Sequence, residues 1–153
     1  MNETARILLI DDDEFVRKTI SKALEKAGYR VDTAESGAEA LEKARTNFYN
    51  LALIDIRLPD MEGTKLLTAI KDTIPKMVKI ILTGYPSLQN AIDAVNKGAD
   101  AYITKPVDIA ELHKIIKEQL KKQIEEAKFG EKKIGAFVES RLKQLGTKET
   151  NKK

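Results

Sequence analysis

Short apolar runs alternate along the chain with longer segments in which apolar residues recur every three or four positions. The short runs are rich in isoleucine, leucine and valine, as in buried strands, whereas the longer spacing is that of amphipathic helices. This alternation is typical of an α/β domain in which helices cover both faces of a mostly parallel sheet. We expect strands at 7–10, 29–34, 51–55, 78–83 and 101–104, each followed by a helix.

Local signals place the ends of the helices. Gly28 and Gly98 follow helical segments and are expected to end them, because glycine readily adopts the left-handed backbone that closes a helix. Ser36 with a glutamate three residues later is a capping-box pattern that opens a helix to about residue 46. Asp108 precedes the last helix in the same way, and Gly63 follows the loop before the third helix.

Polar residues stand where the apolar runs end. Ligands of doubly wound sheets bind outside the carboxyl ends of the strands, where the strand order reverses. We therefore expect the residues that follow four different strands to meet in one crevice. These are Asp11 and Asp12 after the first strand, Asp55 at the end of the third, Thr83 at the end of the fourth and Lys105 after the fifth.

Three carboxylates in one crevice need a counter-charge. Two ionised carboxylates about 4 Å apart repel by roughly 4 kcal/mol at an effective dielectric near 20. A divalent cation would supply this counter-charge. Mg²⁺ prefers oxygen ligands such as carboxylates, and Mn²⁺ would also fit. A strand-end carboxylate such as Asp55 can act as a nucleophile towards a phosphoryl group. The metal and Lys105 would offset the added charge, and the Thr83 hydroxyl can reach a phosphoryl oxygen.

Five motifs stand in a fixed order and spacing along the chain. They are Ile-Asp-Asp-Asp at 10–13, Asp-Ile-Arg-Leu-Pro-Asp-Met-Glu-Gly at 55–63, Leu-Thr-Gly-Tyr at 82–85, Gly-Ala-Asp-Ala-Tyr at 98–102 and Thr-Lys-Pro at 104–106. From residue 5 to about 120 the chain thereby resembles the receiver domain of two-component response regulators of the chemotaxis-regulator type. The resemblance implies a flavodoxin-like, five-stranded parallel sheet of order 2-1-3-4-5, with a C-terminal helical extension added in this chain.

The resemblance implies that Asp55 accepts a phosphoryl group from a phosphohistidine on a sensor kinase or phosphotransfer protein. Asp11 and Asp12 would bind Mg²⁺ together with Asp55 and the backbone carbonyl of Arg57. The peptide bond between Lys105 and the proline after it is expected to be cis, as it usually is in the family.

The resemblance also implies a switch made of Thr83 and Tyr102. Thr83 would move towards the phosphoryl group while Tyr102 turns inward. This change would alter the face made by the fourth helix, fifth strand and fifth helix, which would then bind a downstream protein or a second copy. Arg57 and Tyr85 are expected only to modulate dephosphorylation.

Two polar residues receive ordinary structural interpretations. Asp13 directly precedes the first helix, so we expect it to cap that helix rather than to bind the metal. His113, the sole histidine, falls in the fifth helix and is expected to be a surface residue without a function.

Composition narrows the class of protein. The chain has 153 residues and no cysteine, which excludes disulfides and thiolate metal sites and favours a cytoplasmic protein. Its apolar runs are far shorter than the roughly 20 residues that span a bilayer. Residues 1–106 hold 15 Lys and Arg against 16 Asp and Glu, a net of −1, whereas residues 128–153 hold 8 against 3, a net of +5. Direct nucleic-acid binding is therefore not expected of the main domain.

The end of the chain forms a separate segment in this interpretation. We expect a receiver domain at 1–127 and a basic amphipathic helical extension at 128–153, disordered from Thr147 onward. A first apolar stripe runs to Ile124, and a second one follows Gly130 and leaves three alternatives. The second stripe consists of Ile134, Phe137, Val138, Leu142 and Leu145. It self-associates or docks on another protein, packs back on the receiver, or is mostly disordered. The chain either signals by protein contact as a stand-alone receiver or is the receiver fragment of a longer transcriptional regulator.

An enzyme of the haloacid dehalogenase type is the main rival. That class also uses a strand-end aspartate with Mg²⁺, but it needs a second aspartate two residues later as the general acid. Here that position is Arg57. We therefore expect a phosphoryl-accepting signalling protein that assists only its own phosphorylation and dephosphorylation, not an enzyme.

Overall fold

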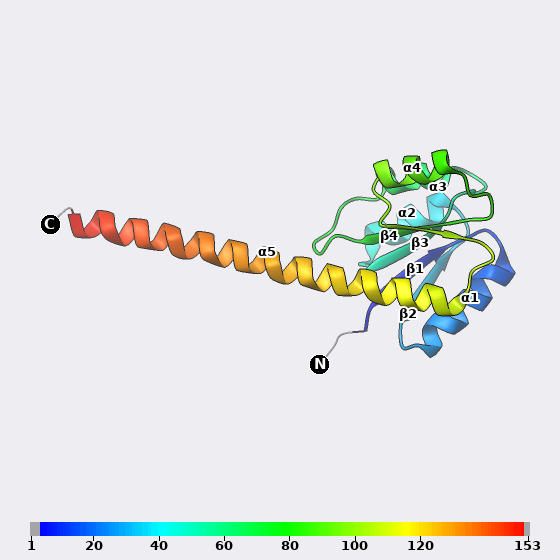
Figure 1. Cartoon of the computed structure of the whole chain (residues 1–153), viewed down its shortest axis with the longest axis horizontal. Coiled ribbons are helices and arrows are strands. Elements are labelled where there is room, and N and C mark those ends of the chain that lie inside the picture. The colour runs from blue at the N-terminus through cyan, green and yellow to red at the C-terminus, as the bar shows by residue number, and fades with distance from the viewer. Residues whose placement is uncertain (1–3, 152–153) are drawn as a thin grey trace.

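The computed structural model describes the backbone of residues 4–151 and the side chains of residues 4–145. A five-stranded, all-parallel sheet lies between two layers of helices (Figure 1). Its strand order is β2-β1-β3-β4-β5, which confirms the predicted topology. The strands are β1 (Arg6–Ile10), β2 (Arg30–Ala34), β3 (Leu51–Asp55), β4 (Val78–Thr83) and β5 (Ala101–Thr104).

Two hydrophobic clusters hold the helices to the sheet. Alternate residues of a strand point to opposite faces, so Leu9 and Leu53 belong to one cluster and Leu8 and Ile54 to the other. The first cluster lies under α1 and α5, and the second lies under the other three helices (Figure 1). The helices are α1 (Glu14–Lys26), α2 (Gly37–Thr46), α3 (Gly63–Ala69), α4 (Leu88–Asn96) and α5 (Ile109–Asn151).

The helix ends confirm the predicted caps. The Ser36 hydroxyl accepts the Glu39 N–H at 3.2 Å. The Glu39 carboxylate accepts the N–H of Glu35, one residue before the position that an ideal capping box uses. The Asp108 carboxylate accepts the first free N–H groups of α5. Gly28 has φ +100°, the left-handed conformation that closes α1.

Helix α5 is longer than the sequence analysis predicted. It runs without a break through Asn151 and so includes residues 147–151, for which the sequence analysis expects disorder; residues 152–153 lie outside the described part. Lysine, glutamate, glutamine and leucine are common along α5, and their high helix propensity offsets its scattered glycines. The helix leaves the domain and projects away from it (Figure 1). No helix in the described chain is long and apolar enough to cross a membrane.

One buried side chain fixes the point where α5 leaves the domain. The Gln123 amide donates hydrogen bonds to the backbone carbonyls of Asn50 and Lys76 at 2.9 and 2.8 Å. Beyond it, the apolar side chains of the second stripe are exposed, so the structure does not have the extension packed back on the receiver. They are Ile134, Phe137, Val138, Leu142 and Leu145.

Candidate functional site

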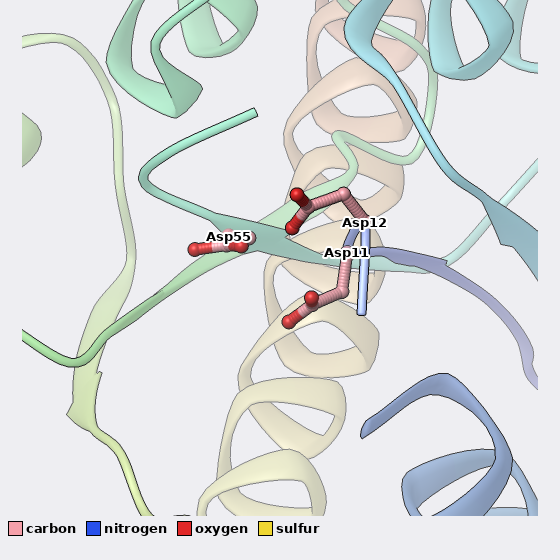
Figure 2. A group of neighbouring side chains, drawn as sticks. All are labelled: Asp11, Asp12 and Asp55. Carbon is pink, nitrogen blue, oxygen red and sulfur yellow. The ribbon is translucent and has the colours of Figure 1, made fainter. Parts of the chain in front are cut away.

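Three carboxylates gather at the carboxyl ends of β1 and β3. Figure 2 shows the side chains of Asp11, Asp12 and Asp55 together. Each places a carboxylate oxygen within 4.8 Å of the other two. Asp11 is fully buried, Asp55 is 6% exposed and Asp12 is open to solvent. The strands carry these residues to one place because β1 and β3 are neighbours in the sheet. The cluster predicted from the sequence is therefore present in the structure.

The ammonium of Lys105 lies against this cluster. Its Nζ donates a hydrogen bond to Asp11 Oδ2 at 2.7 Å and lies 3.5 Å from Asp55 Oδ2. The peptide bond from Lys105 to Pro106 is cis, as expected. Burial alone would lower the pKa of the Lys105 amine, but the hydrogen bond to Asp11 and the attraction of both carboxylates outweigh burial and raise the pKa. Lys105 therefore stays charged beside the two buried carboxylates.

Backbone groups orient the buried carboxylates. The Arg57 N–H donates to Asp55 Oδ1 at 3.2 Å, and the Asp13 N–H donates to Asp11 Oδ1 at 2.9 Å. The Asp13 carboxylate accepts the Val16 N–H at the start of α1, which confirms the predicted helix cap. Asp13 thus fixes the loop after β1 that carries Asp11 and Asp12.

The charged form of Asp55 is disfavoured in the folded protein. Burial and then repulsion from Asp11 raise the pKa of the Asp55 carboxyl above its ordinary value, against the opposing effects of the Arg57 N–H and Lys105. An added cation or a neutral side chain at this position would relieve this cost.

We expect Asp55→Asn to stabilise the metal-free protein at neutral pH. A raised folded-state pKa means that ionisation of Asp55 costs stability, fully above that pKa and not at all below the unfolded-state value. The gain should therefore shrink as the pH falls through the ordinary aspartate range. Urea unfolding of both proteins in EDTA across this range measures it. The exposed change Glu25→Gln is the control, and an Asp55→Asn protein less stable than wild type at neutral pH would contradict this account.

The donor set at the site suits a hard divalent cation. All the side-chain ligands are carboxylate oxygens, which Mg²⁺ prefers. Within the described chain, the exposed carboxylate of Asp12 and the backbone carbonyl of Arg57 accept no hydrogen bond. Both groups are therefore available as further oxygen ligands.

Two more predicted residues lie on the strands next to the cluster. Thr83 is fully buried at the end of β4, and its hydroxyl accepts the Tyr85 N–H at 3.1 Å, which leaves the hydroxyl hydrogen free to donate. Tyr102, on β5, has a buried hydroxyl without a hydrogen-bond partner in the described chain. The Arg57 guanidinium stacks on the Tyr85 ring, 4.3 Å from its centre, so the two expected modulators contact each other beside the site.

Asp60, in the loop after β3, and Gly63, the first residue of α3, shape the site, and the sequence analysis missed their roles. The carboxylate of Asp60 accepts the N–H groups of Gly37 and Ala38 at 2.8 and 2.9 Å, which ties this loop to the start of α2. A Cβ on Gly63 would lie 2.3 Å from the backbone oxygen of Asp55. Both residues lie in the 55–63 motif, but only the folded chain shows what they contact.

Comparison with known proteins identifies the family of this site. The family model described as response regulator receiver domain matches residues 7–117. The chain is 40% identical over 119 residues to the transcriptional regulatory protein ZraR of Klebsiella oxytoca. This match covers 77% of the chain but only 27% of ZraR, so the chain corresponds to a minor part of that protein.

Solved structures show the same fold. A CheY-like response regulator receiver domain protein from Methanospirillum hungatei has 47% identity and a TM-score of 0.77, with 81% of this chain and 99% of that chain covered. A Burkholderia pseudomallei response regulator, solved with a phosphorylated aspartic acid and a calcium ion, has 32% identity and a TM-score of 0.70. That match covers 80% of this chain and 73% of the other.

Proposed function

Because this chain belongs to the response regulator receiver domain family, we propose that Asp55 is its phosphoryl acceptor and that phosphorylation switches a protein-binding surface. One observation carries the proposal. Asp55 lies at a strand end beside two further aspartates and a charged lysine, in a chain whose fold and motifs are those of the family. A dehalogenase-type enzyme would need an aspartate as general acid two residues after Asp55, and that position is Arg57. The Arg57 guanidinium stacks on the Tyr85 ring.

The proposed reaction is a transfer from a phosphohistidine of a sensor kinase or phosphotransfer protein. An oxygen of the Asp55 carboxylate attacks phosphorus, a P–O bond forms, and the P–N bond to the donor imidazole breaks. The other ring nitrogen of the donor carries a proton, so the bonding electrons return to the imidazole and it leaves as the neutral ring. Lys105 offsets the charge carried onto Asp55, and the free hydroxyl hydrogen of Thr83 can donate to a phosphoryl oxygen.

Receiver domains bind Mg²⁺ at an acidic pocket, and in this chain Asp11, Asp12, Asp55 and the carbonyl of Arg57 would hold it. When bound, Mg²⁺ neutralises the carboxylates and the phosphoryl oxygens, and Mn²⁺ could replace it. The excess of negative charge at the site supports this assignment, because Lys105 supplies one positive charge against three carboxylates.

The proposed output is the surface of α4, β5 and α5. Tyr102 has a buried hydroxyl that no group in the described chain satisfies, and an unsatisfied buried hydroxyl favours an alternative position. We infer that Thr83 and Tyr102 move together when Asp55 is phosphorylated. The neighbouring helix α4 exposes Leu88, Ile92 and Val95, which suits contact with a downstream protein or a second copy.

The length of the relatives supports a second candidate for the output. Because ZraR is much longer than its matching segment, this receiver could serve as the regulatory part of a longer transcriptional regulator. In that arrangement α5 would lead to the effector. We place the boundary of the receiver near residue 127, shortly after the anchoring residue Gln123, and assign residues 128–153 to the extension.

The proposed acceptor is tested by incubation with acetyl phosphate and Mg²⁺, followed by intact-mass measurement. Wild type should gain the mass of one phosphoryl group, and the gain should disappear in Asp55→Asn and in wild type treated with EDTA. Glu25→Gln, an exposed change elsewhere, should behave as wild type. An equal gain in Asp55→Asn, or no gain in the wild type, would reject the proposal.

A further inference from the structure

The part of α5 after Gln123 carries one continuous stripe of side chains that contacts no other element of the described chain. Its residues alternate in steps of four and three, so they share one face of the helix. The stripe is apolar except at Glu131 and Arg141, and its members are exposed along the projecting part of α5 (Figure 1). We call Ala127, Glu131, Ile134, Val138, Arg141 and Leu145 the tail stripe.

The tail stripe is symmetric about its centre. Glu131 lies five residues before Ala136, and Arg141 lies five residues after it. Ile134 and Val138 lie two residues to either side of the same point, and Ala127 and Leu145 lie nine. Each apolar position thus mirrors an apolar one, and the acidic position mirrors the basic one. No ion pair of Glu131 or Arg141 occurs in the described chain, so both charges are available to a partner.

We propose that the tail stripe binds a second copy of this chain in an antiparallel helix pair centred on Ala136. In this pairing each residue lies level with its mirror position in the partner. Glu131 of each copy then lies opposite Arg141 of the other, which gives two ion pairs. Ile134 meets Val138, and Ala127 meets Leu145, each twice because the pair has twofold symmetry. All six positions of the stripe are matched.

A parallel arrangement of the same two helices is disfavoured by repulsion between like charges. In register, it would place Glu131 against Glu131 and Arg141 against Arg141 in the middle of the interface. Like charges at facing core positions are destabilising and select against that pairing. The opposite charges of Glu131 and Arg141 therefore favour the antiparallel pairing of two copies over the parallel one.

The paired segment begins beyond the last hydrogen bonds between α5 and the receiver. Gln123 is the last residue of α5 that hydrogen-bonds to the rest of the domain in the described chain, and the stripe begins four residues later. The paired segment from Ala127 to Leu145 is about 27 Å long at 1.5 Å per residue. The two receivers would then lie at opposite ends of the pair. The pairing does not depend on phosphorylation, so it can fail while the proposed function holds, and the reverse.

Charge reversal tests the pairing on the full-length, unphosphorylated chain by sedimentation equilibrium. Glu131→Arg should weaken the dimer by at least about tenfold, because it places two arginines opposite each other at both ends of the pair. Arg141→Glu should weaken it likewise, by facing two glutamates. The double exchange of Glu131→Arg with Arg141→Glu should restore the wild-type affinity. Glu139→Arg, the same charge change outside the tail stripe, is the matched control.

A distance measurement tests the direction of the pair. The chain has no cysteine, so a single Lys121→Cys change on the exposed side of α5 can carry one spin label. In the antiparallel pair the two labels are separated by thirty residues of helix, or about 45 Å along the axis. In a parallel pair they would lie side by side at less than about 30 Å.

The outcomes are distinct. A dimer that both single reversals weaken, that the double exchange restores, and that gives the long distance supports the proposal. A chain that stays monomeric would overturn it, and the tail stripe would then belong to another partner. A dimer whose affinity is unchanged by the single charge reversals would also overturn it, because the contact would then lie elsewhere. A dimer with the short label distance would overturn it as well, because the two helices would then run parallel. Circular dichroism of each variant confirms that the helix is retained.

Discussion

Lys105→Met should slow phosphorylation of Asp55 by acetyl phosphate at least about 100-fold, the usual cost of removing one preorganised electrostatic group. The Lys105 ammonium lies 3.5 Å from the Asp55 carboxylate, where negative charge accumulates during transfer. Methionine keeps the length of the side chain and removes the charge, so the change isolates the electrostatic contribution. The rate is measured from intact mass against time at saturating Mg²⁺.

The same change should destabilise the metal-free protein by about 3 kcal/mol, because breaking a buried ion pair leaves one charge uncompensated. Here the group left alone is the Asp11 carboxylate, which is fully buried and 2.7 Å from the lysine. Added Mg²⁺ should therefore stabilise Lys105→Met more than it stabilises wild type. Urea unfolding with and without Mg²⁺ measures both effects, and Lys117→Met, at an exposed position of α5, is the control.

A Lys105→Met protein that is phosphorylated at the wild-type rate would show that the lysine only supports the fold. If Lys105→Met were as stable as wild type in EDTA, the ion pair with Lys105 would not be needed to compensate the buried charge of Asp11. The two measurements separate the role of Lys105 in the reaction from its role in holding the carboxylate cluster.

Gly63→Ala is expected to have the largest effect on folding. The new Cβ would meet the backbone oxygen of Asp55 at 2.3 Å and the Cα of Ile56 at 2.9 Å. Neither atom can move away freely, because Asp55 ends β3 and the Ile56 N–H that follows donates to the Leu82 carbonyl at 3.0 Å. Gly63 also donates its own N–H to the Ile56 carbonyl at 2.7 Å. Overpacking of this kind costs about 1–3 kcal/mol and occasionally more, and we expect the upper part of that range.

The loss of stability in Gly63→Ala should be accompanied by slower phosphorylation, since the displaced backbone is that of Asp55 itself. Gly84→Ala is the matched control: a Cβ there meets no atom within 4 Å, and its φ is not in the left-handed region. Its free energy of unfolding should stay within about 0.5 kcal/mol of wild type. Equal stability of both alanine variants would mean that the close approach at Gly63 does not constrain the site.

The strands and the carboxylate cluster could be predicted because each depends on a short stretch of sequence. A strand buried on both faces appears as an apolar run, and in a parallel sheet all such runs end at the same edge. Asp11, Asp55 and Lys105 follow three of these runs directly, so their meeting could be inferred without knowing any side-chain contact.

The remaining features depend on contacts between distant segments. The hydrogen bonds of Asp60 to the start of α2 join residues more than twenty positions apart, and no local pattern indicates them. Lys105 lies closer to Asp11 than to Asp55, at 2.7 against 3.5 Å, and only the folded positions of the three residues show this. The end of α5 could not be placed from composition, because Thr147, Thr150 and Asn151 have low helix propensity and yet lie within the helix.

The central claim is that Asp55, and neither of its acidic neighbours, carries the phosphoryl group. Borohydride reduces an acyl phosphate to an alcohol, so treatment of the phosphorylated protein converts the acceptor aspartate to homoserine, which peptide mass spectrometry can locate. We predict homoserine at position 55 and unchanged aspartate at positions 11 and 12. Homoserine at Asp11 or Asp12, or at no aspartate of a protein that has gained a phosphoryl mass, would contradict the account.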